Sequence, residues 1–261
     1  MTFGTGLLKR KILSRGTESG SAVNLIPRAA ASATVILFLR TDIWQQVSFN
    51  DRNKMSQDIG YLLWADEQLV TVIEARIKSS SGDESADWYS VFFDGEMRQR
   101  ARSSTYILKR TMGRPRDIFA YASFALEEAK RAGHESVLAE DIYASESRFS
   151  RHVLDELTDE IAPSVSDFAS VLATLKALNR RSFGWSDWFE KAGAQGLDES
   201  EARQALEQLF EASVVGVLEV GGGGGGSRSR YRYQDNYLQP REDALMQVHL
   251  AVTKELGLKD S

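Results

Sequence analysis

The sequence predicts a mostly helical α+β protein with a flexible tail (residues 1–32), a first folded part (33–165) and a second folded part (166–261). Apolar residues recur at helical spacing through most of the chain. One continuous apolar run with β-branched residues stands at 33–39. Near the C-terminus, two strand-like segments flank six consecutive glycines. The 261 residues suffice for two domains, at about 100 to 200 residues per domain.

The composition is that of a soluble globular protein. Hydrophobic residues make up 42% of the chain and charged residues 26%, which sets it apart from disordered proteins. The chain has no cysteine, which excludes disulfides, cysteine-ligated metals and thiol chemistry and suits the reducing cytoplasm. No apolar run approaches the roughly 20 residues of a membrane span, so we expect no membrane contact. The net charge of −5 means that any nucleic-acid contact needs a local basic patch.

The first part begins with a single predicted strand and continues in helices. The run Ala33–Leu39 is typical of a strand covered on both faces in a parallel sheet. No second run of this kind follows, so this part is either mostly helical or the rear of a larger α/β domain. After it, Leu69, Ile73 and Ile77 are spaced four apart, which predicts an amphipathic helix.

Two longer helices complete the first part. The segment Gly113–Asp117 breaks the chain and starts a helix that Gly133 stops. Its apolar face is Ile118, Tyr121, Ala122, Ala125, Leu126 and Ala129. A second helix is expected from Ala139 to about Ile161, where Pro163 ends it. We place the domain boundary at Pro163–Asp167.

The second part has the element order of a winged helix. Three helices are expected at 168–178, 185–194 and 198–212. They precede a valine-rich strand (214–220), the glycine turn and an alternating strand (228–234). A closing helix is expected at 240–256. We expect Trp185 and Trp188 in the core.

No catalytic or metal-binding motif is present. The phosphate-cradling sequence G-x-x-x-x-G-K-[ST] does not occur, and neither does a G-x-S-x-G elbow. His134, His152 and His249 are too far apart for a zinc motif. We therefore predict no catalytic residue and no metal ligand in this chain.

Two polar groups are candidate phosphate readers. Arg40, Thr41 and Asp42 follow the apolar strand, where open α/β sheets place ligand-contacting residues; a strand-end turn capped by Asp42 is the alternative. Arg114 and Arg116 lie on a rigid turn at a helix start, where guanidinium groups and the positive helix end both suit phosphate oxygens. Pairing of these arginines with Asp117 as a helix cap is the alternative.

A resemblance to a known family rests on several short stretches. The stretches that resemble the rear half of a bacterial P-loop ATPase are Leu37–Ile43, Asn50–Lys54, Trp64–Arg76, Gly113–Ile118, Phe149–Ser150 and Leu154–Leu157. The branch is that of AAA+ and STAND enzymes related to origin-recognition ATPases, with a winged-helix tail. The resemblance covers about residues 33–162, and the sequence G-R-P-R-D-I is its most specific element.

The resemblance implies an incomplete ATPase core with a helical lid. Arg40, Thr41 and Asp42 would stand at the sensor-1 position, and Arg114 or Arg116 at sensor 2, reading the nucleotide's γ-phosphate. The Walker A and Walker B parts are missing from this chain. It would therefore have no cofactor alone, and ATP with Mg²⁺ only if a P-loop half is supplied. A P-loop-bearing chain or a homo-oligomer is the expected partner.

DNA binding, if present, is expected in the wing. The helix at 198–212 carries five acidic residues and one arginine, so a phosphate backbone would repel it. Arg228, Arg230 and Arg232 alternate along the second strand, so strand geometry would place them on one face. That face could bind phosphates weakly and with strong salt dependence. A solvated edge strand protected by charge is the alternative.

The sequence thus favours a regulatory or interaction portion of a P-loop ATPase system that is not catalytically competent alone. A DNA-binding winged-helix regulator and a residual ATP-binding protein are the two alternatives.

Overall fold

The structure of the protein is a computed structural model that describes residues 36–39, 44, 47–48, 54–55, 58–219, 221 and 226–259. The chain divides into a unit of residues 1–62 and a unit of residues 63–261. The first unit contains residues 33–39, for which the sequence predicts a strand. The described residues of this stretch, Ile36 to Leu39, lie in neither a helix nor a strand, and their side chains are exposed. The expectation of a buried strand is wrong for these four residues, because no strand pairs with them among the described residues.

Helices build the first half of the second unit. They are α2 (Asp66–Ser81), α3 (Ser103–Leu108), α4 (Pro115–Ala132) and α5 (Ala139–Ile161), with one-turn helices η2 (Trp88–Ser90), η3 (Arg98–Arg100) and η4 (Ala162–Ser164). The predictions for α2, α4 and α5 are confirmed. Pro115 stands in the first turn of α4, and Gly133 ends the helix in a left-handed conformation at φ 79°. The helix α3 has too short an apolar pattern to be predicted.

Helices and a small sheet build the second half. The helices are α6 (Phe168–Ala177), α7 (Trp185–Ala194), α8 (Glu199–Glu211) and α9 (Leu250–Leu256). The strands are β1 (Ser182–Phe183), β2 (Val215–Glu219), β3 (Arg228–Arg230) and β4 (Leu245–Val248). All pairs are antiparallel, in the order β1-β4-β2-β3. Asp198 starts α8 by accepting a hydrogen bond from the Glu201 backbone nitrogen.

Two predictions near the C-terminus are corrected. The strand expected at 228–234 ends at Arg230, because Tyr231 begins a turn in which its carbonyl accepts from Gln234. The closing helix begins at Leu250 and not at residue 240. Residues 245–248 form β4, with Met246 and Val248 buried between the more exposed Leu245 and Gln247, which is the period of a strand. Residues 222–225 of the glycine run lie outside the described residues.

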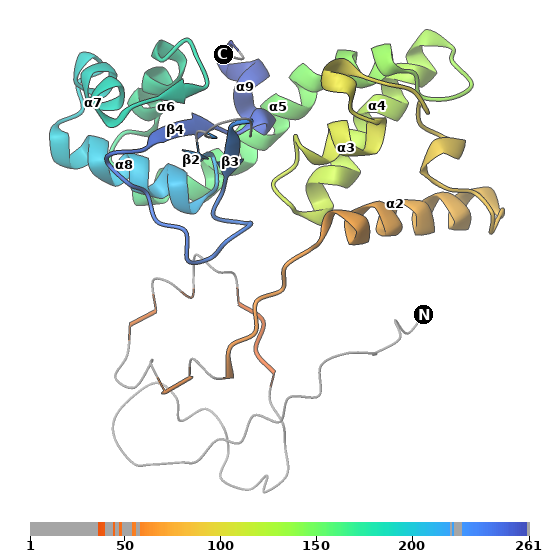
Figure 1. The fold of residues 1–261 in the computed structure, drawn as a ribbon, viewed down its shortest axis with the longest axis horizontal. Coiled ribbons are helices and arrows are strands. Elements are labelled where there is room, and N and C mark those ends of the chain that lie inside the picture. The colour runs from red at the N-terminus through yellow and green to blue at the C-terminus, as the bar shows by residue number, and fades with distance from the viewer. Residues whose placement is uncertain are drawn as a thin grey trace, which may run out of the picture. The chain divides into compact units, whose positions relative to one another are not determined.

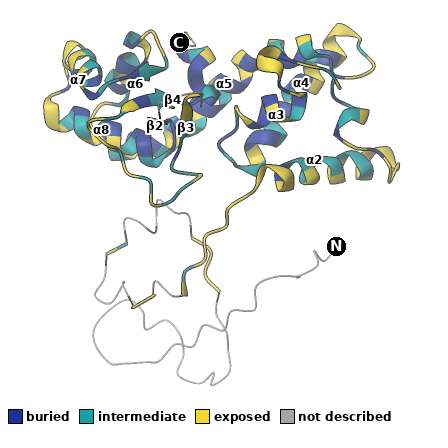
Figure 2. Ribbon diagram, viewed as in Figure 1, coloured by how far each residue is buried: buried dark blue, intermediate teal, exposed yellow. Residues whose placement is uncertain are grey.

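One continuous core joins both halves of this unit. Figure 2 shows buried residues on the inner sides of the helices and on the sheet. Trp188 is fully buried and Trp185 nearly so, as predicted. The long helix α5 packs against α4 along much of its length, from Arg148 to Glu160, and against α9 near its middle, at Glu146 and Ser150 (Figure 1). The two halves are therefore joined through α5 and α9 as well as through the backbone at η4.

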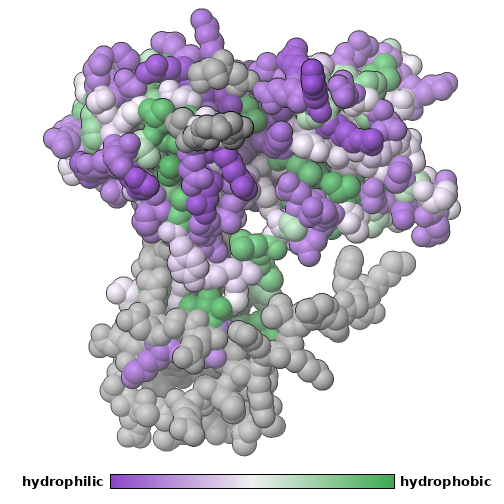
Figure 3. Space-filling view, viewed as in Figure 1, coloured by the Kyte–Doolittle hydropathy of each residue, from purple (hydrophilic) through white to green (hydrophobic). Residues whose placement is uncertain are grey.

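Polar residues cover much of the face of this unit that Figure 3 displays. Within the described part of the chain, no helix is both long enough and apolar enough to cross a membrane.

Candidate functional site

The arginine turn, residues 113–117, lies at the start of α4. Gly113 adopts φ +66°, and Arg114 is the extended residue that precedes Pro115. This geometry follows from the sequence, because proline fixes the first helical residue and disfavours helical backbone before it. The side chains of Arg114 and Arg116 are 30% and 48% exposed. Both can therefore be reached from solvent.

Carboxylates of α5 hold these two guanidinium groups. Glu160 bridges them, with Oε2 at 3.4 Å from Arg114 Nη2 and Oε1 at 3.1 Å from Arg116 Nη2. Glu156 lies 3.3 Å from the same Arg116 nitrogen. The turn is thus fastened to α5 by exposed ion pairs, which are individually weak.

Asp117 anchors the turn from inside. Its side chain is almost completely buried and accepts a hydrogen bond from the Met112 backbone nitrogen at 3.2 Å. Burial raises the pKa of this carboxyl, and the neighbouring charges of Arg114 and Arg116 oppose that rise. The Nε of Arg116 lies 3.6 Å from Asp117. The arrangement contains the expected Arg/Asp pairing and adds the two glutamates of α5.

The turn also touches the C-terminal half. A Cβ atom placed on Gly113 would lie 2.8 Å from the ring of Tyr233, so only glycine fits there without a shift of that ring. The rings of Tyr231 and Tyr233 stack at 6.0 Å, and both meet the ring of His249 edge-on. His249 is buried and accepts a hydrogen bond from the Ala251 backbone nitrogen through Nδ1. Burial, followed by nearby arginine charges, lowers the pKa of His249 to about 3.

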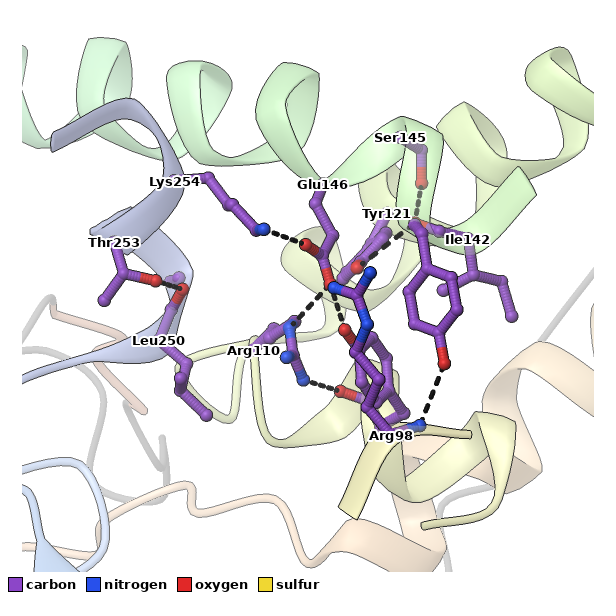
Figure 4. A network of polar contacts seen from close by, with 12 residues as sticks. Arg98, Arg110, Tyr121, Ile142, Ser145, Glu146, Leu250, Thr253 and Lys254 are labelled. Atoms are coloured by element: carbon purple, nitrogen blue, oxygen red, sulfur yellow. Dashed lines mark hydrogen bonds and ion pairs between the residues drawn. The ribbon is translucent and has the colours of Figure 1, made fainter. Parts of the chain in front are cut away.

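A second polar cluster surrounds Glu146 of α5 (Figure 4). The carboxylate is almost inaccessible and lies 3.3 Å from Arg110 Nε and 3.1 Å from Lys254 Nζ of α9. It also accepts a hydrogen bond from the hydroxyl of Tyr106. Burial and this hydrogen bond raise the pKa of Tyr106. Because these side chains come from α3, α5, α9 and the segment after α3, the cluster ties the two halves together.

The three arginines predicted for DNA binding do not form one free row. Arg230 pairs with Glu219 at 3.1 Å and with Asp235 at 2.6 Å. Arg232 lies beyond the end of β3, where it donates to Glu211 at 3.0 Å and to the Leu238 carbonyl at 2.7 Å. Arg228 is exposed and has no ion pair among the described residues. Two of the three positive charges are thus balanced within the chain.

The remaining predicted residues are placed as follows. Arg40, Thr41 and Asp42 lie outside the described residues. His134 contacts Asp141 through Nδ1 at 2.9 Å, His152 faces Glu156, and His249 is buried elsewhere. In the part of the chain that the structure describes, no group of three or more potential ligand side chains could hold a metal ion.

Sequence reasoning did not single out Glu146, Glu156, Glu160 or Tyr233. Glu156 and Glu160 are four residues apart on α5, which places them on one helical face and was the available signal for a paired acidic site. No sequence signal connects them with arginines more than 40 residues away. Glu146 is conspicuous only as an acidic residue on an otherwise apolar face.

Residues 67–158 match a family model described as the FunZ-associated C-terminal helical domain. The matched segment runs from the first turn of α2 into the last turns of α5 and includes both the arginine turn and Glu146. The match does not reach β1, the first strand of the sheet. No curated protein matches the chain, and no solved structure does.

Chemically, the arginine turn offers two guanidinium groups that are held by exchangeable carboxylates. A phosphate group presents oxygens in a similar arrangement and carries more charge, so it could replace Glu156 and Glu160 as the partner. The Glu146 carboxylate is closed to solvent, so its cluster serves to hold the halves in place.

Proposed function

We propose that this chain is a regulatory and interaction portion of a P-loop ATPase system and lacks catalytic competence alone. The observation that carries the proposal is the bridging of Arg114 and Arg116 by Glu160, at 3.4 and 3.1 Å. Arginine side chains that are partly exposed and paired with the partly exposed carboxylates of Glu156 and Glu160 are suited to respond when a phosphate approaches. The match of residues 67–158 to a C-terminal helical domain supports the placement of this portion in the C-terminal part of a larger protein.

In this proposal, residues 33–165 are an AAA+-like remnant with a helical lid. Arg114 or Arg116 would contact the γ-phosphate of ATP bound by a P-loop that this chain does not contain. Phosphoryl transfer needs the P-loop lysine and a held magnesium ion, so the chain would supply only charge stabilisation and sensing. Arg40, Thr41 and Asp42 are proposed as a second sensor, from the sequence alone.

The second half of the chain is proposed to be a winged-helix domain. The chain order α6-β1-α7-α8-β2-β3-β4, with β4 between β1 and β2 in the sheet, supports this proposal. The helix α8 would be the recognition helix, but its exposed side chains include Glu199 and Glu207. Its arginine, Arg203, faces Glu242 at 2.7 Å. This charge distribution favours a protein partner over DNA for α8.

The first experiment asks whether ATP hydrolysis requires another part. The purified chain should release no phosphate from Mg-ATP. The coding sequence upstream of Met1, read in frame for G-x-x-x-x-G-K-[ST], is the first place to look for the missing half. Phosphate release by the pure chain that disappears on Arg116→Ala would contradict the proposal.

The second experiment tests the arginine turn with the P-loop part added. Arg114→Ala and Arg116→Ala should each lower kcat, because they remove charge that stabilises the transition state. Arg131→Ala is the matched control, since Arg131 is on the same helix and pairs with Glu128 at its far end. Unchanged kcat in both turn variants would exclude a sensor role for the turn.

The DNA-binding alternative is tested with a labelled duplex at several salt concentrations. If the wing arginines contact phosphates, replacing Arg228, Arg230 and Arg232 by alanine should reduce the salt slope by about three units. The alternative of residual ATP binding predicts a higher melting temperature with ATP in the isolated chain.

A further inference from the structure

The arginines of the described region differ in how their charge is balanced. Most of them form ion pairs with carboxylates of the same chain. These are Arg102, Arg110, Arg114, Arg116, Arg131, Arg148, Arg151, Arg180, Arg203, Arg230, Arg232 and Arg241. Arg98 and Arg100, which are nearly adjacent and exposed, have no ion pair among the described residues. Together with Arg102 they form the arginine loop, residues 98–102.

Two buried anchors project this loop into solvent. Met97 and Ala101 are buried on either side of Arg98, Gln99 and Arg100, and the Met97 nitrogen donates to the Ala101 carbonyl at 2.8 Å. Closing such a short loop forces Gln99 and Arg100 into the left-handed region, at φ 62° and 55°. Side chains other than glycine rarely adopt this backbone, at a cost of about 1 kcal/mol or more for each residue. The buried anchors Met97 and Ala101 hold the loop in this conformation.

Aromatic rings lie against two of the guanidinium groups, and that of Arg102 also donates a hydrogen bond to Asp94 at 3.2 Å. The Arg98 guanidinium carbon lies 4.2 Å from the centre of the Tyr143 ring, and that of Arg102 lies 5.2 Å from the centre of the Tyr89 ring. A guanidinium group above a ring is attracted through its flat face, whereas its N–H donors point outward in its own plane. The donors of Arg98 therefore remain available to a ligand.

The two tyrosines are themselves fixed. The hydroxyl of Tyr143 accepts a hydrogen bond from the Arg98 backbone nitrogen at 2.8 Å, and that of Tyr89 bonds Ser104 at 3.2 Å. Figure 4 shows the Arg98 side chain extending from its loop toward the Glu146 carboxylate. A ligand would thus meet guanidinium groups that are already oriented, which reduces the entropy lost on binding.

A ligand of this loop must compete with the acidic residues that lie beside the arginines. Asp94 lies 3.2 Å from Arg102, with both side chains at least 60% exposed, and Glu96 is also exposed. A single carboxylate from a partner would gain little over Asp94. A chain of phosphates brings several negative charges, and each phosphate has oxygens for two parallel guanidinium hydrogen bonds.

We propose that the arginine loop binds the phosphate backbone of single-stranded nucleic acid. The outer faces of the Arg98 and Arg102 guanidinium planes can stack on unpaired bases, while the N–H donors contact phosphates. A duplex offers only its phosphates to such a short loop. The wing is the poorer site, because two of its three arginines would first have to leave Asp235 and Glu211, whereas in the loop only Arg102 pairs with a carboxylate, that of Asp94. This inference does not depend on the proposed ATPase function.

The test compares two triple variants with equal loss of charge, R98A/R100A/R102A and R228A/R230A/R232A. Each is titrated into fluorescein-labelled oligothymidylate of about 20 nucleotides, longer than typical site sizes of 4 to 16, at several salt concentrations. Each phosphate contact contributes about 0.7 to the salt slope for a single strand, so the loop variant should reduce the slope by about two units. The wing variant should leave the slope unchanged. Melting temperatures confirm that both variants are folded.

A charge-preserving variant and two competitors complete the test. R98K/R100K/R102K should keep most of the slope and bind more weakly, because lysine retains the charge but cannot stack. Duplex DNA of the same length should compete less well than the single strand, and polyglutamate should not compete. The proposal is overturned by absence of binding at low salt, by loss of binding in the wing variant alone, or by competition from duplex or polyglutamate equal to that of the single strand.

Discussion

Replacing Glu146 by glutamine should destabilise the unit of residues 63–261 far more than the same change at an exposed ion pair. The Glu146 side chain is 2% exposed, and that of Arg110 is 12% exposed. The substitution leaves the Arg110 guanidinium inside the protein without a carboxylate. Breaking a buried ion pair from one side costs about 3 to 5 kcal/mol.

Two features of the cluster reduce this cost. Lys254 is 48% exposed and can return its charge to water. The Arg110 guanidinium also keeps its position 3.5 Å from the centre of the Tyr106 ring. We therefore expect a loss of about 2 to 3 kcal/mol in the free energy of unfolding. In a unit of this size, the melting temperature should fall by roughly 4 to 12 °C.

Urea unfolding followed by circular dichroism measures the change. Glu127→Gln is the matched control, because Glu127 pairs with Arg148 at about half exposure and should cost less than about 1 kcal/mol. Lys254→Gln should fall between the two, since it removes the more exposed cation. If Glu146→Gln costs no more than Glu127→Gln, the cluster does not hold the halves together and the reasoning from burial fails.

Three further predictions concern the arginine turn and its surroundings. Gly113→Ala should lower the free energy of unfolding by about 1 to 3 kcal/mol, and Gly82→Ala by about 1 kcal/mol. Both glycines have positive φ, but only at Gly113 would the new methyl group meet a ring, that of Tyr233. Equal losses of stability in urea unfolding would refute the contact with Tyr233. Folding lowers the pKa of His249 from an ordinary 6.5 to about 3, so as the pH falls the unfolded chain binds this proton at a higher pH than the folded protein does. Stability should fall with pH below 6.5, by about 2 kcal/mol between pH 6.5 and about pH 5. His249→Asn should remove this dependence and His152→Asn should retain it. The double variant Glu156→Gln/Glu160→Gln should bind inorganic tripolyphosphate more tightly than the wild type in calorimetry, and adding Arg116→Ala should abolish the gain.

The helices could be predicted because their signals are local. Pro115 and Gly133 mark the ends of α4 within the chain itself, and Pro163 marks the end of α5. The sheet could not be predicted in full. The strand β1 has two residues and exists only through its pairing with β4, more than 60 residues away. The sequence predicts one helix over the residues that form β4 and α9. An apolar alternation of only four residues, directly before a true helix, cannot be distinguished from an earlier turn of that helix.

The candidate site was predictable in its arginines and not in their partners. The proline and the glycine around Arg114 and Arg116 mark a rigid turn in any fold. Their contacts with Glu156 and Glu160 depend on how α4 packs against α5, which the periodicity of each helix alone does not specify. The prediction that Arg228, Arg230 and Arg232 share one face rests on the two-residue repeat of a strand. This repeat ends with β3 at Arg230, so it does not place Arg232.

The return of α9 onto α5 has a consequence for dissecting the protein into pieces. A fragment that ends at Pro163 would retain all of α5 but would expose the side of that helix that α9 covers. Its Ser150 hydroxyl would also lose the hydrogen bond that the Glu255 backbone nitrogen donates to it at 3.0 Å. The complementary fragment would contain Lys254 without Glu146, its ion-pair partner. A protease that nicks the backbone near η4 should therefore leave both pieces associated through size-exclusion chromatography, and separate expression should give two poorly soluble halves that recover their fold when refolded together.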